Sequence, residues 1–136
     1  MLRVVADTNV FISALMFGGV PGAFLDLALL PSFTLVTSPG LLDELDEKLR
    51  VKFGVSDSDA ALIRARLEAT ALVVEPEVVL ADVKDDPDDD RVLECAITGK
   101  ADYIVSGDRH LLKLGAYQGI PILSVRQFMD SIEAGS

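Results

Sequence analysis

Leu2-Arg3-Val4-Val5-Ala6-Asp7 is a short apolar run that ends at an acid, a pattern typical of a buried strand in a parallel sheet. A second run of this kind, Tyr103-Ile104-Val105, leads through Ser106-Gly107 to Asp108. Further strands are expected at 33–37, 72–74 and 122–125, and helical patterns lie between the strands. This alternation of strands and helices predicts a layered α/β fold.

The helical segments carry recognisable start and stop signals. Ser38 and Ser56 are in N-cap positions, Pro39 is suited to a first helical turn, and Gly99 ends a helix. The helix after Ser56 is expected to turn Leu62, Ile63 and Leu67 inward. The expected helices are 8–17, 21–30, 39–49, 56–71, 88–98, a short one around Leu111 and Leu112, and 126–132.

The composition fits one soluble domain spanning residues 1–136. Half of the 136 residues are hydrophobic, which allows a well-buried core and argues against disorder. The formal net charge is −10, and eight acids against one base between Glu75 and Asp90 account for −7 of it. Such a stretch is either a solvated loop or part of a cation site, and it contrasts with the basic surface usual for phosphate binding.

The cysteine count and the N-terminal residues indicate a cytoplasmic location. Cys95 is the single cysteine, so no internal disulfide can form, and we expect it to be a core residue. No signal peptide is recognised. The apolar stretch 10–30 is broken by Gly18-Gly19-Val20-Pro21-Gly22, which favours two buried helices over a membrane span.

Two acids directly follow predicted strands. Ligand sites in open parallel sheets lie beyond the carboxyl ends of the strands, so Asp7 and Asp108 would share one edge if their strands are neighbours. The alternative for each of them is an N-cap of the following helix.

Helical periodicity adds a third acid and leaves a fourth open. Asp89 falls on the same face as Val92, Leu93 and Ala96, whereas Asp90 is about 100° away from that face. An inward carboxylate needs backbone amides or a metal as its partner. In the helix after Ser38, Glu44 and Asp46 flank the leucine stripe on opposite sides, and helical geometry does not choose between them.

Carboxylates without cysteine or histidine partners suit a hard cation, Mg²⁺ or Mn²⁺. An EF-hand is excluded because Arg91 stands where that loop needs glycine, and Ile97 stands where it needs a bidentate glutamate. The glycine-rich phosphate-binding motifs of nucleotide-binding proteins are absent from the sequence.

At this point the chain resembles the PIN-domain ribonucleases, and more narrowly the toxin components of bacterial type II toxin–antitoxin pairs (VapC-like). The resemblance covers nearly the whole length. It rests on Asp7-Thr8-Asn9, on Ser38-Pro39 with Glu44-Leu45, on Asp86-Pro87-Asp88-Asp89 before Val92-Leu93, and on Ala101-Asp102-Tyr103-Ile104-Val105-Ser106-Gly107-Asp108. It implies a three-layer α/β/α sandwich around a parallel sheet, Mg²⁺-dependent cleavage of RNA and an antitoxin partner. We also expect the protein to be a homodimer.

The resemblance also implies which side chains form the site. Its four acidic positions, catalytic and metal-binding, fall on Asp7, Glu44, Asp89 and Asp108, and its supporting positions fall on Thr8, Asn9, Asp86 and Ser106. Ser106 stands where threonine is commoner, and Asp90 where a neutral polar residue is usual. The third acid therefore remains open among Asp86, Asp89 and Asp90.

The bases nearest the site in sequence, Arg109 and Lys113, are candidate RNA contacts, and a second group comprises Lys48, Arg50, Lys52, Arg64 and Arg66.

Two other functions compete with this one. The first is a protein-interaction module that binds an antitoxin or a second copy of itself. Its apolar side chains would serve as a dimer face or as core: Phe11, Leu15, Met16, Phe17, Phe24 and Leu27. The second is a phosphatase, but Asp7-Thr8-Asn9 lacks the second aspartate, two positions on, of haloacid-type phosphatases.

Overall fold

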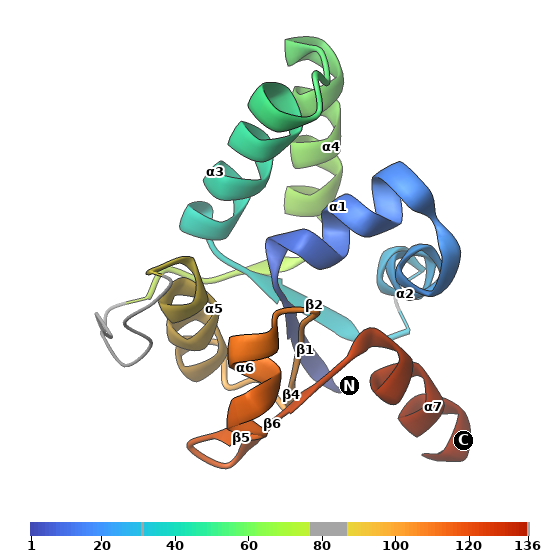
Figure 1. The fold of residues 1–136 in the computed structure, drawn as a ribbon, viewed down its shortest axis with the longest axis vertical. Coiled ribbons are helices and arrows are strands. Elements are labelled where there is room, and N and C mark those ends of the chain that lie inside the picture. Colours follow the sequence, from blue (N-terminus) through green and yellow to red (C-terminus); the bar gives the residue numbers. More distant parts are fainter. Residues whose placement is uncertain (31, 77–86, 136) are drawn as a thin grey trace.

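A computed structural model describes residues 1–30, 32–76 and 87–135, with the side chains of 87–89, 134 and 135 left out. Its sheet has six strands in the order β3-β2-β1-β4-β6-β5 (Figure 1). The strands are β1 (Arg3–Ala6), β2 (Thr34–Thr37), β3 (Leu72–Val73), β4 (Tyr103–Val105), β5 (Ala116–Tyr117) and β6 (Ile120–Leu123). The strand pairs from β3 to β6 are parallel, as the sequence predicts.

Helices follow most of the strands, and their bounds agree closely with the sequence patterns. They are α1 (Thr8–Phe17), α2 (Gly19–Leu29), α3 (Pro39–Glu47) with its π-helical continuation η1 (Lys48–Lys52), α4 (Asp57–Thr70), α5 (Pro87–Thr98), α6 (Arg109–Leu114) and α7 (Val125–Gly135). Ser38 and Ser56 are N-caps as predicted, accepting hydrogen bonds from the backbone N–H groups of Leu41 and Asp59.

Two hydrophobic clusters on opposite sides of the sheet make the fold a three-layer α/β/α sandwich. Val4 and Leu35 face α1, α2 and α7, whereas Val5 and Ile104 face α5 and α6. The helices therefore divide between the two faces, and α3 and α4 extend beyond the carboxyl end of the sheet (Figure 1).

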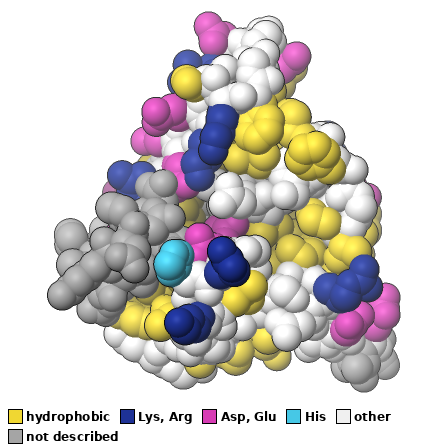
Figure 2. Space-filling model, in the orientation of Figure 1, with side chains coloured by type: hydrophobic (Ala, Val, Ile, Leu, Met, Phe, Trp, Pro, Cys, Tyr) yellow, Lys and Arg dark blue, Asp and Glu magenta, His cyan; other side chains and the backbone are white. Residues whose placement is uncertain are grey.

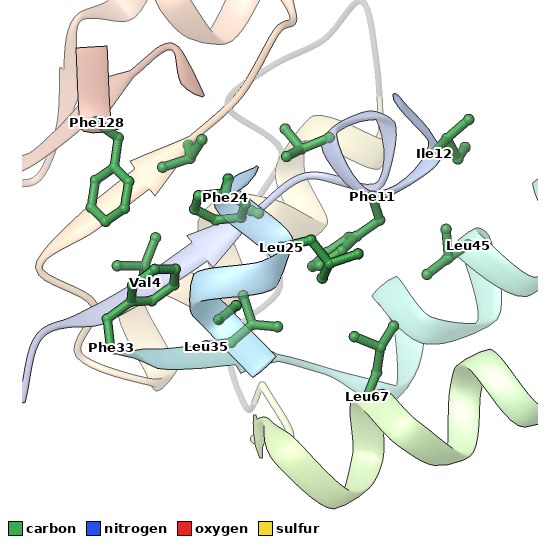
Figure 3. Packing of buried hydrophobic residues seen from close by; sticks show 14 of the residues in the cluster. Val4, Phe11, Ile12, Phe24, Leu25, Phe33, Leu35, Leu45, Leu67 and Phe128 are labelled. Atoms are coloured by element: carbon green, nitrogen blue, oxygen red, sulfur yellow. The ribbon is translucent and has the colours of Figure 1, made fainter. Parts of the chain in front are cut away.

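The larger cluster is built around aromatic side chains. The ring of Phe24 on α2 lies 5.3 Å from that of Phe33 and 5.6 Å from that of Phe128 on α7, in tilted and edge-on arrangements. Figure 3 shows these rings gathered over Val4 and Leu35 of the sheet. Because this packing fixes α2 and α7 on one face, the first strand is enclosed on that side and its carboxyl end is held in place.

The structure corrects three details of the sequence analysis. The sheet is not wholly parallel, because β5 pairs antiparallel with β6 through a turn in which Gln118 and Gly119 have positive φ. The second helix begins at Gly19 rather than at Pro21. Leu62, expected to face inward, is 69% exposed, and the inner side of α4 is formed by Ala60 and Leu67.

Among the described residues, no single helix combines the length and apolar composition that a membrane span needs. The consecutive helices α1 and α2 together have that length and apolar composition, but the chain bends by 107° between them.

Candidate functional site

Asp7 and Asp108 meet at the carboxyl edge of the sheet because β1 and β4 are parallel neighbours. Ala6 is in register with Val105, and the backbone N–H of Asp7 donates to the carbonyl oxygen of Val105 at 3.1 Å. Ser106 joins the two acids: its hydroxyl donates to Oδ2 of Asp7 and accepts from the backbone N–H of Asp108 at 2.9 Å. The predicted shared edge is therefore present.

Each of these aspartates is also the N-cap of the helix that follows it. Oδ1 of Asp7 accepts from the N–H of Val10 at 3.1 Å, and Oδ1 of Asp108 accepts from the N–H of His110 at 2.7 Å. The capping alternative is thus correct, and it does not exclude the shared edge. Capping fixes each carboxylate through one oxygen and orients the other.

Glu44 on α3 is buried, with a relative exposure of 8%, and it contacts Thr8, the residue after Asp7. Its Oε1 accepts hydrogen bonds from Oγ1 of Thr8 and from Nζ of Lys48, both at 2.8 Å. Its Oε2 is buried and has no hydrogen-bond partner among the described residues. Asp46 instead forms an ion pair with Arg50 at 2.9 Å near the surface. The fold therefore distinguishes Glu44 from Asp46, which helical periodicity could not do.

The third acid is only partly described. Asp86 lies outside the described residues, and Asp89 is described in its backbone alone, at the first turn of α5. Asp90 is 8% exposed, although helical geometry placed it about 100° from the apolar face. The buried side of α5 is therefore wider at its first turns than Val92 and Leu93 indicate. The choice of Asp89 stays a prediction.

Burial raises the pKa of Asp7 above its ordinary value of 3.8, and the negative charge of Asp108 raises it further. Hydrogen bonds from Ser106 and from the backbone of Val10 and Asn9 act in the opposite direction. Asn9, predicted to support the site, is itself exposed. Ser106 links the carboxylate of Asp7 to the backbone of Asp108, and the charge of Asp108 acts on the pKa of Asp7 across this edge of the sheet.

The donor set fits a divalent cation. Carboxylate and hydroxyl oxygens are the ligands that Mg²⁺ and Mn²⁺ prefer, and a buried carboxylate oxygen without a partner needs a positive or hydrogen-bonding group. Oε2 of Glu44 is such an atom. Within the described residues, no three acidic, cysteine or histidine side chains are grouped closely enough to bind a metal. Asp7, Glu44 and Asp108 are all described, so the structure brings Asp7 and Asp108 to one sheet edge but does not assemble them with Glu44 into a ligand set.

A cleft of about 520 Å³ opens beside Glu44. Besides Gly40 and Val51, its lining consists of acids and bases: Asp43, Glu44, Glu47, Lys48, Lys52 and Arg91. On this face of the molecule, acidic side chains lie in the centre and Lys and Arg side chains lie on both sides, over α3 and over α6 (Figure 2).

The bases divide into paired and unpaired groups. Arg50 and Arg64 form ion pairs with acids of the helical surface. Arg109 and Lys113 are exposed on α6, and no ion pair joins them to a carboxylate of the described part of the chain.

Sequence analysis did not recognise Lys48 as the partner of Glu44. The signal was present, because an acid four residues before a lysine on a helix is a favourable pairing.

Cys95 is a fully buried core residue, as predicted, and burial raises the pKa of its thiol to about 12. Such a thiol is not a nucleophile.

Comparison with known proteins decides the family. The family model of the PIN domain matches residues 3–110. The chain belongs to the PIN domain family. It is 34% identical over 119 residues to an uncharacterized protein, MJ1680, of Methanocaldococcus jannaschii, a match covering 83% of this chain and 75% of that protein. PIN domains are generally nucleases and usually use divalent metals, which agrees with the carboxylates at the sheet edge.

Proposed function

We propose that this PIN domain protein is a metal-dependent ribonuclease that hydrolyses phosphodiester bonds in RNA. Its catalytic and metal-binding side chains would be Asp7, Glu44, Asp89 and Asp108, with Mg²⁺ or Mn²⁺ as the cation. The observation that carries the proposal is that Asp7 and Asp108 follow neighbouring parallel strands and are linked through Ser106, which bonds the carboxylate of Asp7 and the backbone of Asp108. Glu44, bonded to Thr8, is buried with one oxygen that has no partner among the described residues.

The chain's own residues would act by positioning charge. When bound, a divalent cation supplies positive charge that stabilises phosphoryl oxygens and makes a water acidic enough to attack phosphorus. Ser106 holds Oδ2 of Asp7 in place, and Thr8 does the same for Oε1 of Glu44. Without a cation, these carboxylates would repel one another and a phosphate backbone, so the metal-free protein is expected to be inactive.

RNA would be held by bases beside the acidic centre. Arg109 and Lys113 on α6 are exposed and are not neutralised by an acid of the described residues, in contrast to Arg50 and Arg64. Phosphate contacts by Lys and Arg supply most of the affinity of proteins for nucleic acids. This distribution reconciles RNA binding with a net charge of −10.

We further propose that the protein is the toxin of a toxin–antitoxin pair, as a homodimer with an antitoxin as its partner. Apolar side chains exposed at the end of α1 support a protein-binding surface: Leu15 and Met16 are 37% exposed and Phe17 is 80% exposed. The same side chains favour the alternative, a PIN domain that mainly binds an antitoxin or itself. Protein that cuts no RNA with Mg²⁺ but forms a stable complex would favour that alternative.

The cleavage experiment compares three variants on a single-stranded RNA with Mg²⁺. Asp7→Asn and Glu44→Gln are expected to lower the rate by at least a factor of about 100, because each removes a charge on which the cation depends. Asp46→Asn, on the same helix as Glu44, is the matched control and is expected to leave the rate within about twofold.

Each variant needs an intact fold, checked by circular dichroism, and added EDTA is expected to abolish wild-type cleavage. RNA cleavage retained by pure Asp7→Asn, or equal losses in Glu44→Gln and Asp46→Asn, would rule out the proposed site.

A further inference from the structure

Lys48 is bound directly to the buried acid of the candidate site. Its Nζ lies 2.8 Å from Oε1 of Glu44 and 3.4 Å from Oγ1 of Thr8. The lysine side chain is 25% exposed and the glutamate 8%, so this ion pair is largely removed from solvent. Its attraction is consequently stronger and less screened by salt than that of a surface pair.

The two carboxylate oxygens of Glu44 have different surroundings. Oε1 accepts both from Thr8 and from Lys48, while Oε2 is buried with no partner among the described residues. Two hydrogen bonds to Oε1 favour this orientation of the carboxylate and leave Oε2 without a donor among the described residues. A cation bound at Oε2 would share this one carboxylate with the lysine charge.

We infer that Lys48 is an internal counter-cation of the metal site: it orients Glu44 and lowers the affinity of the site for divalent cations. This rests on the proposed metal dependence and adds a positioning residue to it. In the metal-free protein, the ammonium group adds a positive charge beside a buried carboxylate that also accepts a hydrogen bond from the hydroxyl of Thr8. In the loaded protein, the same positive charge repels the bound ion, which favours weak and exchangeable binding over tight binding.

The matched variants are Lys48→Met and Arg50→Met. Both remove one positive charge from η1, and both bases form i,i+4 ion pairs, Lys48 with buried Glu44 and Arg50 with the more exposed Asp46. Affinity for Mn²⁺ is measured by calorimetry, without RNA, together with the melting temperature with and without Mn²⁺. Lys48→Met is expected to bind Mn²⁺ roughly tenfold more tightly than the wild type because a nearby repulsion is removed.

Arg50→Met is expected to bind Mn²⁺ within twofold of the wild type, since its charge is screened by solvent. Lys48→Arg keeps the charge and should resemble the wild type. Lys48→Met should also melt lower than the wild type without Mn²⁺ and gain more from Mn²⁺. Equal affinities in Lys48→Met and Arg50→Met, weaker binding in Lys48→Met, or no Mn²⁺ binding by the wild type would each overturn the inference.

A parallel RNA cleavage assay separates this inference from the proposed function. Tighter Mn²⁺ binding by Lys48→Met in a protein that cuts no RNA would contradict the ribonuclease and leave the counter-cation standing. Normal cleavage with no difference between the two methionine variants would do the reverse.

Discussion

At the residue scale, the site uses ordinary capping interactions for a second purpose. Asp7 and Asp108 each cap a helix through Oδ1, and their position after β1 and β4 was predictable from the apolar runs that precede them. The identity of the fourth acid was not predictable in this way. Glu44 and Asp46 flank the leucine stripe equally. Glu44 is distinguished by its contacts with Thr8, which is distant in the sequence, and with Lys48, which lies one helical turn further on.

The raised pKa of Asp7 predicts that the metal-free fold gains stability when this charge is removed. Ionised Asp7 destabilises the fold at pH values above its raised pKa. This destabilisation vanishes below pH 3.8, where the carboxyl group is protonated in both the folded and the unfolded protein. In EDTA at pH 7, Asp7→Asn should therefore melt higher by about 2–5 °C, since asparagine keeps the cap. This advantage should shrink as the pH falls towards the ordinary value.

Melting curves from pH 7 to pH 3.5 test this, with Asp46→Asn as the control. Asp46 is paired with Arg50 at the surface, so its variant should not gain stability at pH 7. A lower melting temperature for Asp7→Asn at neutral pH would show that its hydrogen bonds outweigh burial and repulsion.

At the scale of elements, strand order and helix packing bring the acids together. Patterns of apolar residues predicted β1, β4 and α1 nearly to the residue, because each is a mostly apolar run. They missed β5, which has two residues and pairs only with the adjacent strand of a hairpin. Its formation depends on the positive φ of Gln118 and Gly119 rather than on a hydrophobic period.

The close packing of α5 on the sheet depends on Gly99. A Cβ at this position would lie 2.5 Å from Cγ1 of Val36 on β2 and 3.1 Å from the carbonyl oxygen of Cys95. Gly99→Ala is therefore expected to destabilise the protein by about 1–3 kcal/mol, as overpacking does in well-packed interiors. Because α5 carries Asp89 and Asp90, the metal affinity should fall as well.

Gly22→Ala is the control for Gly99→Ala. A Cβ there would make an ordinary contact of 3.8 Å with the carbonyl oxygen of Ala14, and alanine is the better helix former inside α2. Urea denaturation should show an unchanged or raised free energy of unfolding. An unchanged free energy of unfolding in Gly99→Ala would indicate that α5 shifts without cost, and a similar loss in both variants would show that the loss does not come from the close contact with Val36.

At the scale of the whole molecule, the question is how an acidic protein binds RNA. The net charge of −10 is spread unevenly, and the face in Figure 2 has bases on both sides of its acidic centre. Composition alone could not predict this arrangement, because the arrangement depends on which bases form ion pairs with acids of the protein. Arg64 is held by Asp43 and Glu68, whereas Arg109 and Lys113 have no such partner in the described ranges.

RNA affinity should therefore depend on α6 and not on the surface of α3 and α4. The double variant Arg109→Gln, Lys113→Gln is measured in the Asp7→Asn background, so that RNA is bound without being cut. Loss of two phosphate contacts should weaken binding and reduce the slope of log K against log [salt] by about 1.4, at about 0.7 per contact with a single strand. The double variant Arg50→Gln, Arg64→Gln removes the same charge from bases already neutralised by acids. It should change the slope little, and equal effects of the two double variants would mean that RNA responds to net charge rather than to the face around Asp7 and Asp108.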